Sequence, residues 1–111
     1  YAGMQPITVY FPIGKAVLDE PELKHLDFYA GNIIEKVDMD PGIEITVMGS
    51  ADSNTGTARR NGYLSEARGQ YIMKILSEKY GIDTNKMVVK TKVVKATGNP
   101  VMDRAAVITF K

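Results

Sequence analysis

The fold and the candidate site of this chain are decided by two neighbouring segments: GSADSNTG at residues 49–56 and NGYLSEAR at residues 61–68. The first follows an alternating apolar run and is polar and punctuated by glycine, whereas the second opens a long amphipathic stretch. Together they predict a strand, a polar loop and a helix. Asp52 lies in the predicted loop, and Arg68 lies two turns into the predicted helix. An anion and a cation near the start of a helix suit a ligand that carries both an amine and a carboxylate.

Upstream of these segments the sequence predicts a strand, a helix and a second strand. Residues 7–11 are β-branched and aromatic, which is typical of a strand. A helix is expected to begin at Asp19, with Glu22 at the reciprocal position of a capping box. Its apolar residues recur at steps of three and four, as Leu23, Leu26, Ala30, Ile33 and Val37. Residues 38–42 should end this helix, and residues 43–49 alternate as a half-buried strand does.

Downstream, a second helix is predicted over about residues 57–80, with Gly81 as its left-handed terminal residue. Residues 87–94 and 105–110 read as two further strands. The order strand-helix-strand-helix-strand-strand predicts an α+β fold, a two-layer α/β sandwich. Its two helices should pack on one face of a mixed four-stranded sheet.

The composition indicates one domain spanning residues 1–111, which we expect to be excised from a longer protein. Apolar residues make up 44% of the chain and charged residues 24%, as in ordinary soluble domains. No stretch reaches the ~18 apolar residues of a membrane span. Any membrane attachment is therefore expected to come from a tether outside this sequence.

The helix start suggests how the two charges would bind a ligand. Unpaired N–H groups and the helix dipole make that end attractive to a carboxylate. The guanidinium of Arg68 can hold a carboxylate by two hydrogen bonds, and Asp52 suits an ammonium group. Asn61, Ser65 and Arg68 are spaced by four and three, so they share one helix face. The alternative is that Arg68 pairs internally with Asp52 and only holds the loop in place.

The same residues resemble a known family, the OmpA C-terminal-like domain, which is also found in peptidoglycan-associated lipoproteins and flagellar motor stator proteins. The family pattern is Gly-His-Thr-Asp-x-x-Gly followed by Asn-x-x-Leu-Ser-x-x-Arg-Ala. Seven residues of this chain correspond to it, with one extra residue between Asp52 and Gly56: Gly49, Asp52, Gly56, Asn61, Leu64, Ser65 and Arg68. The resemblance extends over about residues 7–110.

The resemblance implies non-covalent binding of peptidoglycan through the diaminopimelate residue of its stem peptide. It implies that Arg68 meets a carboxylate and Asp52 the amino-acid head group. Backbone groups near Ile13, Gly14 and Ala51 would line the pocket, and Asn61 and Leu64 would support it. The expected location is the periplasmic side of a Gram-negative outer membrane, where the domain would tether that membrane to the cell wall.

The chain departs from the family pattern at the rim of the implied pocket. Ser50 and Ala51 replace a His-Thr pair, and Ile13 and Gly14 replace a Phe-Asp pair. Gly69 replaces a helix alanine, at a cost of ~1 kcal/mol in helix propensity. These changes motivate an alternative function: a structural or partner-binding domain that kept the fold and lost the wall site.

Other functions find little support in the sequence. His25 is the single histidine and cysteine is absent, so we expect no metal site, no cofactor and no catalytic residues. The formal net charge of +1 gives no general attraction to nucleic acid. The lysines of the third predicted strand are expected to protect a sheet edge rather than to bind nucleic acid. These lysines are Lys86, Lys90, Lys92 and Lys95.

Overall fold

The computed structural model describes residues 5–12, 14–52, 57–94 and 104–110. Its elements follow the predicted order of strand, helix, strand, helix, strand and strand, with one short 3-10 turn, η1 (Thr84–Lys86), before the third strand. The elements are β1 (Ile7–Tyr10), α1 (Glu20–Met39), β2 (Ile45–Asp52), α2 (Ala58–Glu78), β3 (Met87–Val94) and β4 (Ala105–Phe110).

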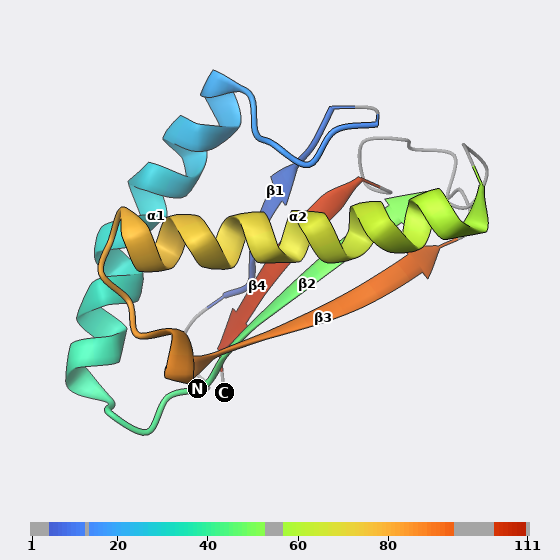
Figure 1. Ribbon diagram of the computed structural model, residues 1–111. Helices are drawn as coiled ribbons and strands as arrows, with labels where there is room; N and C mark the ends of the chain where they lie inside the picture. Colours follow the sequence, from blue (N-terminus) through green and yellow to red (C-terminus); the bar gives the residue numbers. More distant parts are fainter. Residues whose placement is uncertain (1–4, 13, 53–56, 95–103, 111) are drawn as a thin grey trace.

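The four strands form one mixed sheet in the order β1-β4-β2-β3. β2 and β3 run parallel, and β4 pairs antiparallel with both β1 and β2. The last strand of the chain therefore lies inside the sheet, while β3 with its lysines is an edge strand. Both helices cover the same face (Figure 1), so the predicted two-layer sandwich is confirmed.

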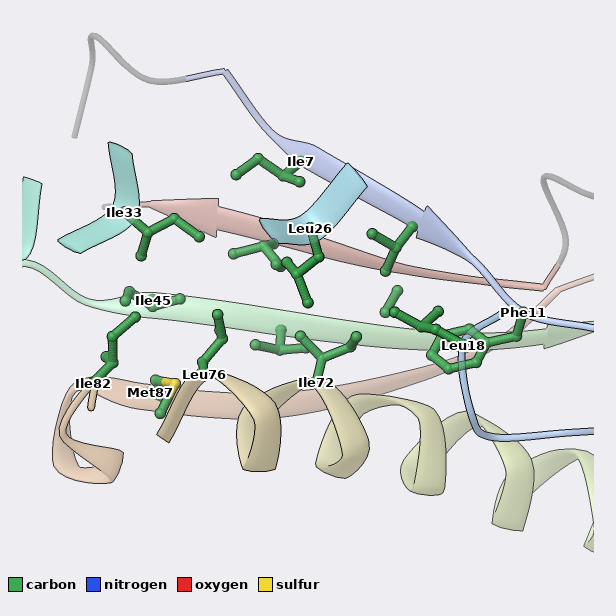
Figure 2. Close-up of a cluster of buried hydrophobic side chains, with 14 residues drawn as sticks. Ile7, Phe11, Leu18, Leu26, Ile33, Ile45, Ile72, Leu76, Ile82 and Met87 are labelled. Carbon is green, nitrogen blue, oxygen red and sulfur yellow. The ribbon is translucent and has the colours of Figure 1, made fainter. Parts of the chain in front are cut away.

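The core fills the space between the two helices and the sheet (Figure 2). Alternate residues of β1 and β2 point into it, which is why Ile7, Val9, Ile45 and Val47 are buried. Each helix contributes its apolar stripe. The helix residues in the cluster are Leu26 and Ile33 from α1, and Ile72 and Leu76 from α2.

β2 is longer than the sequence predicted. Residues 50–52 were expected to start the polar loop, but they continue the parallel pairing, with Ser50 opposite Lys92 and Asp52 opposite Val94. On its other side, the β2–β4 ladder ends at the Gly49–Ala106 pair. Beyond it, the Ser50 hydroxyl donates to the Ala105 carbonyl (3.1 Å) and accepts from the Ala105 amide (3.2 Å). A serine side chain thus takes over from backbone pairing at this point.

The helix starts are confirmed, but one capping interaction is different. Asp19 is the N-cap of α1 and its side chain makes no capping hydrogen bond. The predicted capping box is wrong, because the Glu22 carboxylate accepts from the Tyr10 amide at 2.9 Å and so ties α1 to the end of β1. Thr57 caps α2 by accepting from the Arg60 amide. Gly81 is left-handed, with φ of 73°, as predicted.

α2 crosses β2 at very close range through two glycines. A Cβ atom on Gly49 would overlap the backbone carbonyl of Ser65 and lie 2.7 Å from the amide nitrogen of Gly69. A Cβ on Gly69 would lie 2.6 Å from the Val89 methyl carbon Cγ1. The glycine in the middle of α2 therefore has a packing reason that offsets its low helix propensity. It lets the helix backbone rest directly on β2.

We predict that Gly49→Ala destabilises the domain by about 3 kcal/mol, because the added methyl group meets backbone atoms that cannot rotate away. Gly31→Ala is the matched control, since a Cβ there meets nothing within 4 Å in the exposed middle of α1. This control should gain about 0.5–1 kcal/mol from helix propensity. Urea denaturation of the two variants measures both effects. Equal stabilities would show that the close contact is not a constraint.

Candidate ligand-binding site

Arg68 is the most deeply buried charged residue of the described chain, with 1% of its surface exposed. It projects from α2 toward the end of β2 and the turn that follows β1. Its Nε donates to the carbonyl of Lys15 (3.0 Å), its Nη1 to that of Ser50 (2.8 Å) and its Nη2 to that of Pro12 (3.5 Å). One side chain thus connects α2 with two segments that are distant in sequence.

The guanidinium keeps bonding capacity beyond these contacts. An arginine has five N–H groups, of which three are bonded to carbonyl oxygens here. Two N–H groups are left without a partner among the described residues. Two is the number that a carboxylate takes when it binds an arginine through both oxygens.

Phe11 lies against the guanidinium of Arg68 on one side. The Cζ atom of Arg68 is 5.4 Å from the centre of the Phe11 ring, a cation–π distance. That ring is buried and meets Tyr71 edge to face, with centroids 6.1 Å apart. The Phe11 amide donates a backbone hydrogen bond to the Arg104 carbonyl at 2.8 Å. The base of the site is therefore a packed, apolar surface.

The pKa of Arg68 is lowered from its ordinary value to about 10. Burial is the main cause, because it disfavours the charged form, and the positive charges of Arg104 and Arg60 add to it. Arg68 is still protonated at neutral pH. Its folded-state pKa lies below the unfolded value, so charging it opposes folding at pH 7. This opposition disappears as the pH rises from about 10 to 12.5.

Asn61 adds an unpaired donor on the same face of α2. Only 2% of its surface is exposed, and its side-chain nitrogen Nδ2 has no hydrogen-bond partner among the described residues. A buried amide donor without a partner costs about 1–3 kcal/mol, so Asn61 is a candidate donor for an external acceptor. Seven residues separate Asn61 from Arg68, which puts the two side chains two turns apart on one helix face. Ser65, between them, donates to the carbonyl of Gly62 at 2.9 Å.

The structure brings some of the predicted site residues together. Leu64 is buried beside the Asn61–Arg68 face, as a supporting residue should be. Gly14 is exposed and left-handed, with φ of 69°, in a turn closed by a hydrogen bond from the Lys15 amide to the Pro12 carbonyl (3.2 Å). Gly14 thus belongs to the turn that Arg68 contacts.

For the three other predicted site residues, the structure either gives a different position or does not describe the side chain. Ala51 is not part of a loop: it lies in β2, pairs with Val93 and is 1% exposed, because the parallel ladder continues past Gly49. Asp52 is the last residue of β2, and its side chain lies outside what the structure describes. Ile13 also lies outside the described residues.

Sequence reasoning missed the partners of Arg68. They are the main-chain carbonyls of Pro12, Lys15 and Ser50, and no side-chain pattern reveals such acceptors. It also missed Arg60, whose Nη2 donates to the Gly14 carbonyl at 3.1 Å. The sequence did contain one signal for Arg60, since it is eight residues before Arg68 on the same amphipathic helix.

Two further observations concern the rest of the described chain. A groove of about 460 Å³ lies between β1 and α1, lined by residues that include Tyr10, His25, Tyr29 and Lys36. None of the predicted site residues lines it, so it is separate from the site around Arg68. Within the described residues, neither helix is long and apolar enough to cross a membrane.

Comparisons with known proteins place this geometry among OmpA-like domains. No family model matches the chain. A curated relative, "Outer membrane protein 40" of Porphyromonas gingivalis, is 36% identical over 85 residues, which cover 77% of this chain and 21% of that protein. The chain thus corresponds to about a fifth of that relative's length.

Three solved structures share the fold. The peptidoglycan-associated lipoprotein of Burkholderia pseudomallei has a TM-score of 0.74 at 19% identity, covering 94% of this chain and 89% of that one. The OmpA-like domain of FopA1 from Francisella tularensis has a TM-score of 0.73 at 21% identity, covering 95% and 71%. The C-terminal domain of Helicobacter pylori MotB has a TM-score of 0.73 at 19% identity, covering 98% and 85%.

The chain is therefore an OmpA C-terminal-like domain in its fold, as its motif indicated. The structures share too few residues with it to transfer more than the fold.

We predict that Arg68 titrates near pH 10 in the folded domain. The ¹³Cζ chemical shift of Arg68, followed from pH 7 upward, measures this directly. Arg60→Gln should move the midpoint to higher pH, because it removes one of the positive charges that lower this pKa. An Arg68 that shows no titration below pH 12.5 would contradict the electrostatic description of the site.

Proposed function

We propose that this domain binds peptidoglycan non-covalently, through the diaminopimelate residue of the stem peptide. Its role would be to tether an outer membrane to the cell wall from the periplasmic side. The names of the similar proteins support this setting, since they include an outer membrane protein and a peptidoglycan-associated lipoprotein. The membrane attachment itself would be supplied by a part of the protein outside these residues.

The observation that carries the proposal is the combination of unused donors on one buried helix face. Arg68 keeps two N–H groups and Asn61 keeps its Nδ2 amide, all without partners among the described residues. A ligand carboxylate supplies acceptors for such donors. Burial strengthens these bonds, because the local dielectric is low and water does not compete.

Binding can proceed by exchange at the weakest of the existing contacts. The bond from Arg68 to the Pro12 carbonyl is the longest of the three, at 3.5 Å. A carboxylate that replaces this neutral acceptor forms a charge-assisted bond, which is roughly twice as strong. It also offsets part of the cost of burying the Arg68 charge. Asp52, at the end of β2, would then receive the ammonium group on the same carbon of diaminopimelate.

The proposed activity is binding without chemistry. Carboxylate recognition needs a fixed cation and a donor, and the residues around Arg68 supply both. The similar proteins include an outer membrane protein and a peptidoglycan-associated lipoprotein, and these names support a non-enzymatic role. Release of muropeptides by the pure protein would contradict this part of the proposal.

One observation favours the alternative, a structural or partner-binding domain without a wall site. Arg68 is almost fully buried, and its carbonyl contacts alone would hold the turn after β1 against the end of β2. Under this alternative, changes at Asn61 and Asp52 should leave binding to the cell wall unaffected. The two proposed functions therefore predict different results in one measurement.

That measurement is the retention of the domain on isolated cell-wall sacculi. We predict that Asn61→Ala and Asp52→Asn each weaken binding about ten- to a hundredfold, the effect of losing one charge-assisted hydrogen bond of roughly 1.5–3 kcal/mol. Asn61→Ala should cost little stability, because its Nδ2 has no internal partner to lose. Asn32→Ala, at an exposed position of α1, is the matched control and should bind as the unmodified domain does.

Stability and binding must be measured on the same samples. Arg68→Lys is expected to lose both, since it removes three bonds that organise the turn. It is therefore less informative than Asn61→Ala. Equal retention of the unmodified domain, Asn61→Ala and Asp52→Asn would overturn the proposed site and favour the alternative function.

A further inference from the structure

Two arginines of α2 converge on a single turn, of which the structure describes Pro12, Gly14 and Lys15. Arg68 donates to the carbonyls of Pro12 and Lys15, and Arg60 donates to the carbonyl of Gly14. Both guanidinium groups therefore contact one turn, although the two residues are about two helical turns apart on α2. The left-handed Gly14 lies at the third position of this turn, where a positive φ suits glycine.

The two arginines differ in their exposure. Arg68 is buried beneath the turn, whereas Arg60 is exposed at its rim. The Arg60 side chain also contacts a residue of its own helix, because its Cζ atom lies 5.6 Å from the centre of the Tyr63 ring. Its side chain is thus positioned on the solvent side of the site, with a single hydrogen bond to Gly14 and further N–H groups to offer.

A third arginine adds to the positive charge. Arg104 directs its Nε toward the carbonyl of Phe11 at 3.4 Å, next to the ring that lies against Arg68. Among the described residues, every ion pair is formed by a lysine or a histidine, and none by an arginine. Two guanidinium groups therefore contact this turn and a third contacts the adjacent Phe11, and the acceptors of their side-chain hydrogen bonds among the described residues are all neutral carbonyls. Such a cluster favours a ligand that brings more than one negative charge.

We propose that Arg60 determines which stem peptides this site accepts, by binding a second carboxylate of the ligand that Arg68 binds. The ligand class is a stem peptide with a free second carboxylate near the diaminopimelate head group. The same peptide with that group amidated would be a poorer ligand. This inference rests on the proposed function, because it assumes that Arg68 receives the first carboxylate.

The size of the effect follows from the exposure of Arg60. An exposed charge pair contributes little because water and salt screen it, so the preference is expected to be about fivefold rather than a hundredfold. It should decrease as salt is raised, whereas bonds to the buried Arg68 should be less sensitive. The salt dependence of the preference for the free acid therefore distinguishes a contribution of the exposed Arg60 from one of the buried Arg68.

The test uses two diaminopimelate-containing stem-peptide fragments that differ only at the second carboxylate, one a free acid and one an amide. Their affinities for the unmodified domain, Arg60→Gln and Arg59→Gln are measured by calorimetry at low salt. Arg59 is the matched control, since it is exposed, adjacent in sequence and removes the same charge. The unmodified domain and Arg59→Gln should prefer the free acid about fivefold, and Arg60→Gln should bind both equally.

The possible outcomes distinguish failure of the proposed function from failure of the proposed role of Arg60. If the unmodified domain binds neither fragment, the proposed function fails, and this inference fails with it. If it binds both equally, or if Arg60→Gln keeps the preference, the proposed function stands and the role of Arg60 is overturned. An equal loss of preference in Arg59→Gln would assign the effect to net charge and would likewise overturn the role of Arg60.

Discussion

The direct contact of α2 with β2 at Gly49 and Gly69 is the constraint on which the rest of the structure depends. Without side chains at these two positions, the helix backbone lies against the strand, and the neighbouring Ser65 and Arg68 become buried. Arg68 then reaches the end of β2 and the turn after β1 at the same time. A larger residue at Gly49 would move the helix outward and separate the guanidinium from the carbonyls that hold it.

This arrangement buries a cation among neutral acceptors. Three carbonyl oxygens satisfy part of its hydrogen-bonding capacity, but a carbonyl carries no charge, so the cost of burial remains and the pKa falls to about 10. An anionic ligand offsets this cost, whereas a neutral one does not. The uncompensated charge of Arg68 therefore explains why the domain should prefer carboxylates. The orphaned amide of Asn61 points to the same kind of ligand.

Much of the fold could be predicted from the sequence, because strand alternation, helix periodicity and Gly81 are local signals. The end of β2 could not, since polar residues 50–52 look like a loop until β3 is there to pair with them. Glu22 likewise fits a capping box locally, yet a tertiary contact with Tyr10 takes its carboxylate. Within the site, the spacing of Asn61 and Arg68 was informative. The carbonyl partners of Arg68 were not predictable, because every residue has a carbonyl and only the fold selects which ones converge.

The central claim is that the buried face of α2 binds a ligand carboxylate through Arg68 and Asn61. It is tested most directly by following the side-chain N–H signals of Arg68 Nε and Asn61 Nδ2 by NMR while a diaminopimelate-containing stem peptide is added. We predict that both signals shift together and saturate at one ligand concentration. Saturable binding that leaves both signals unchanged, or no binding at all, would contradict the account.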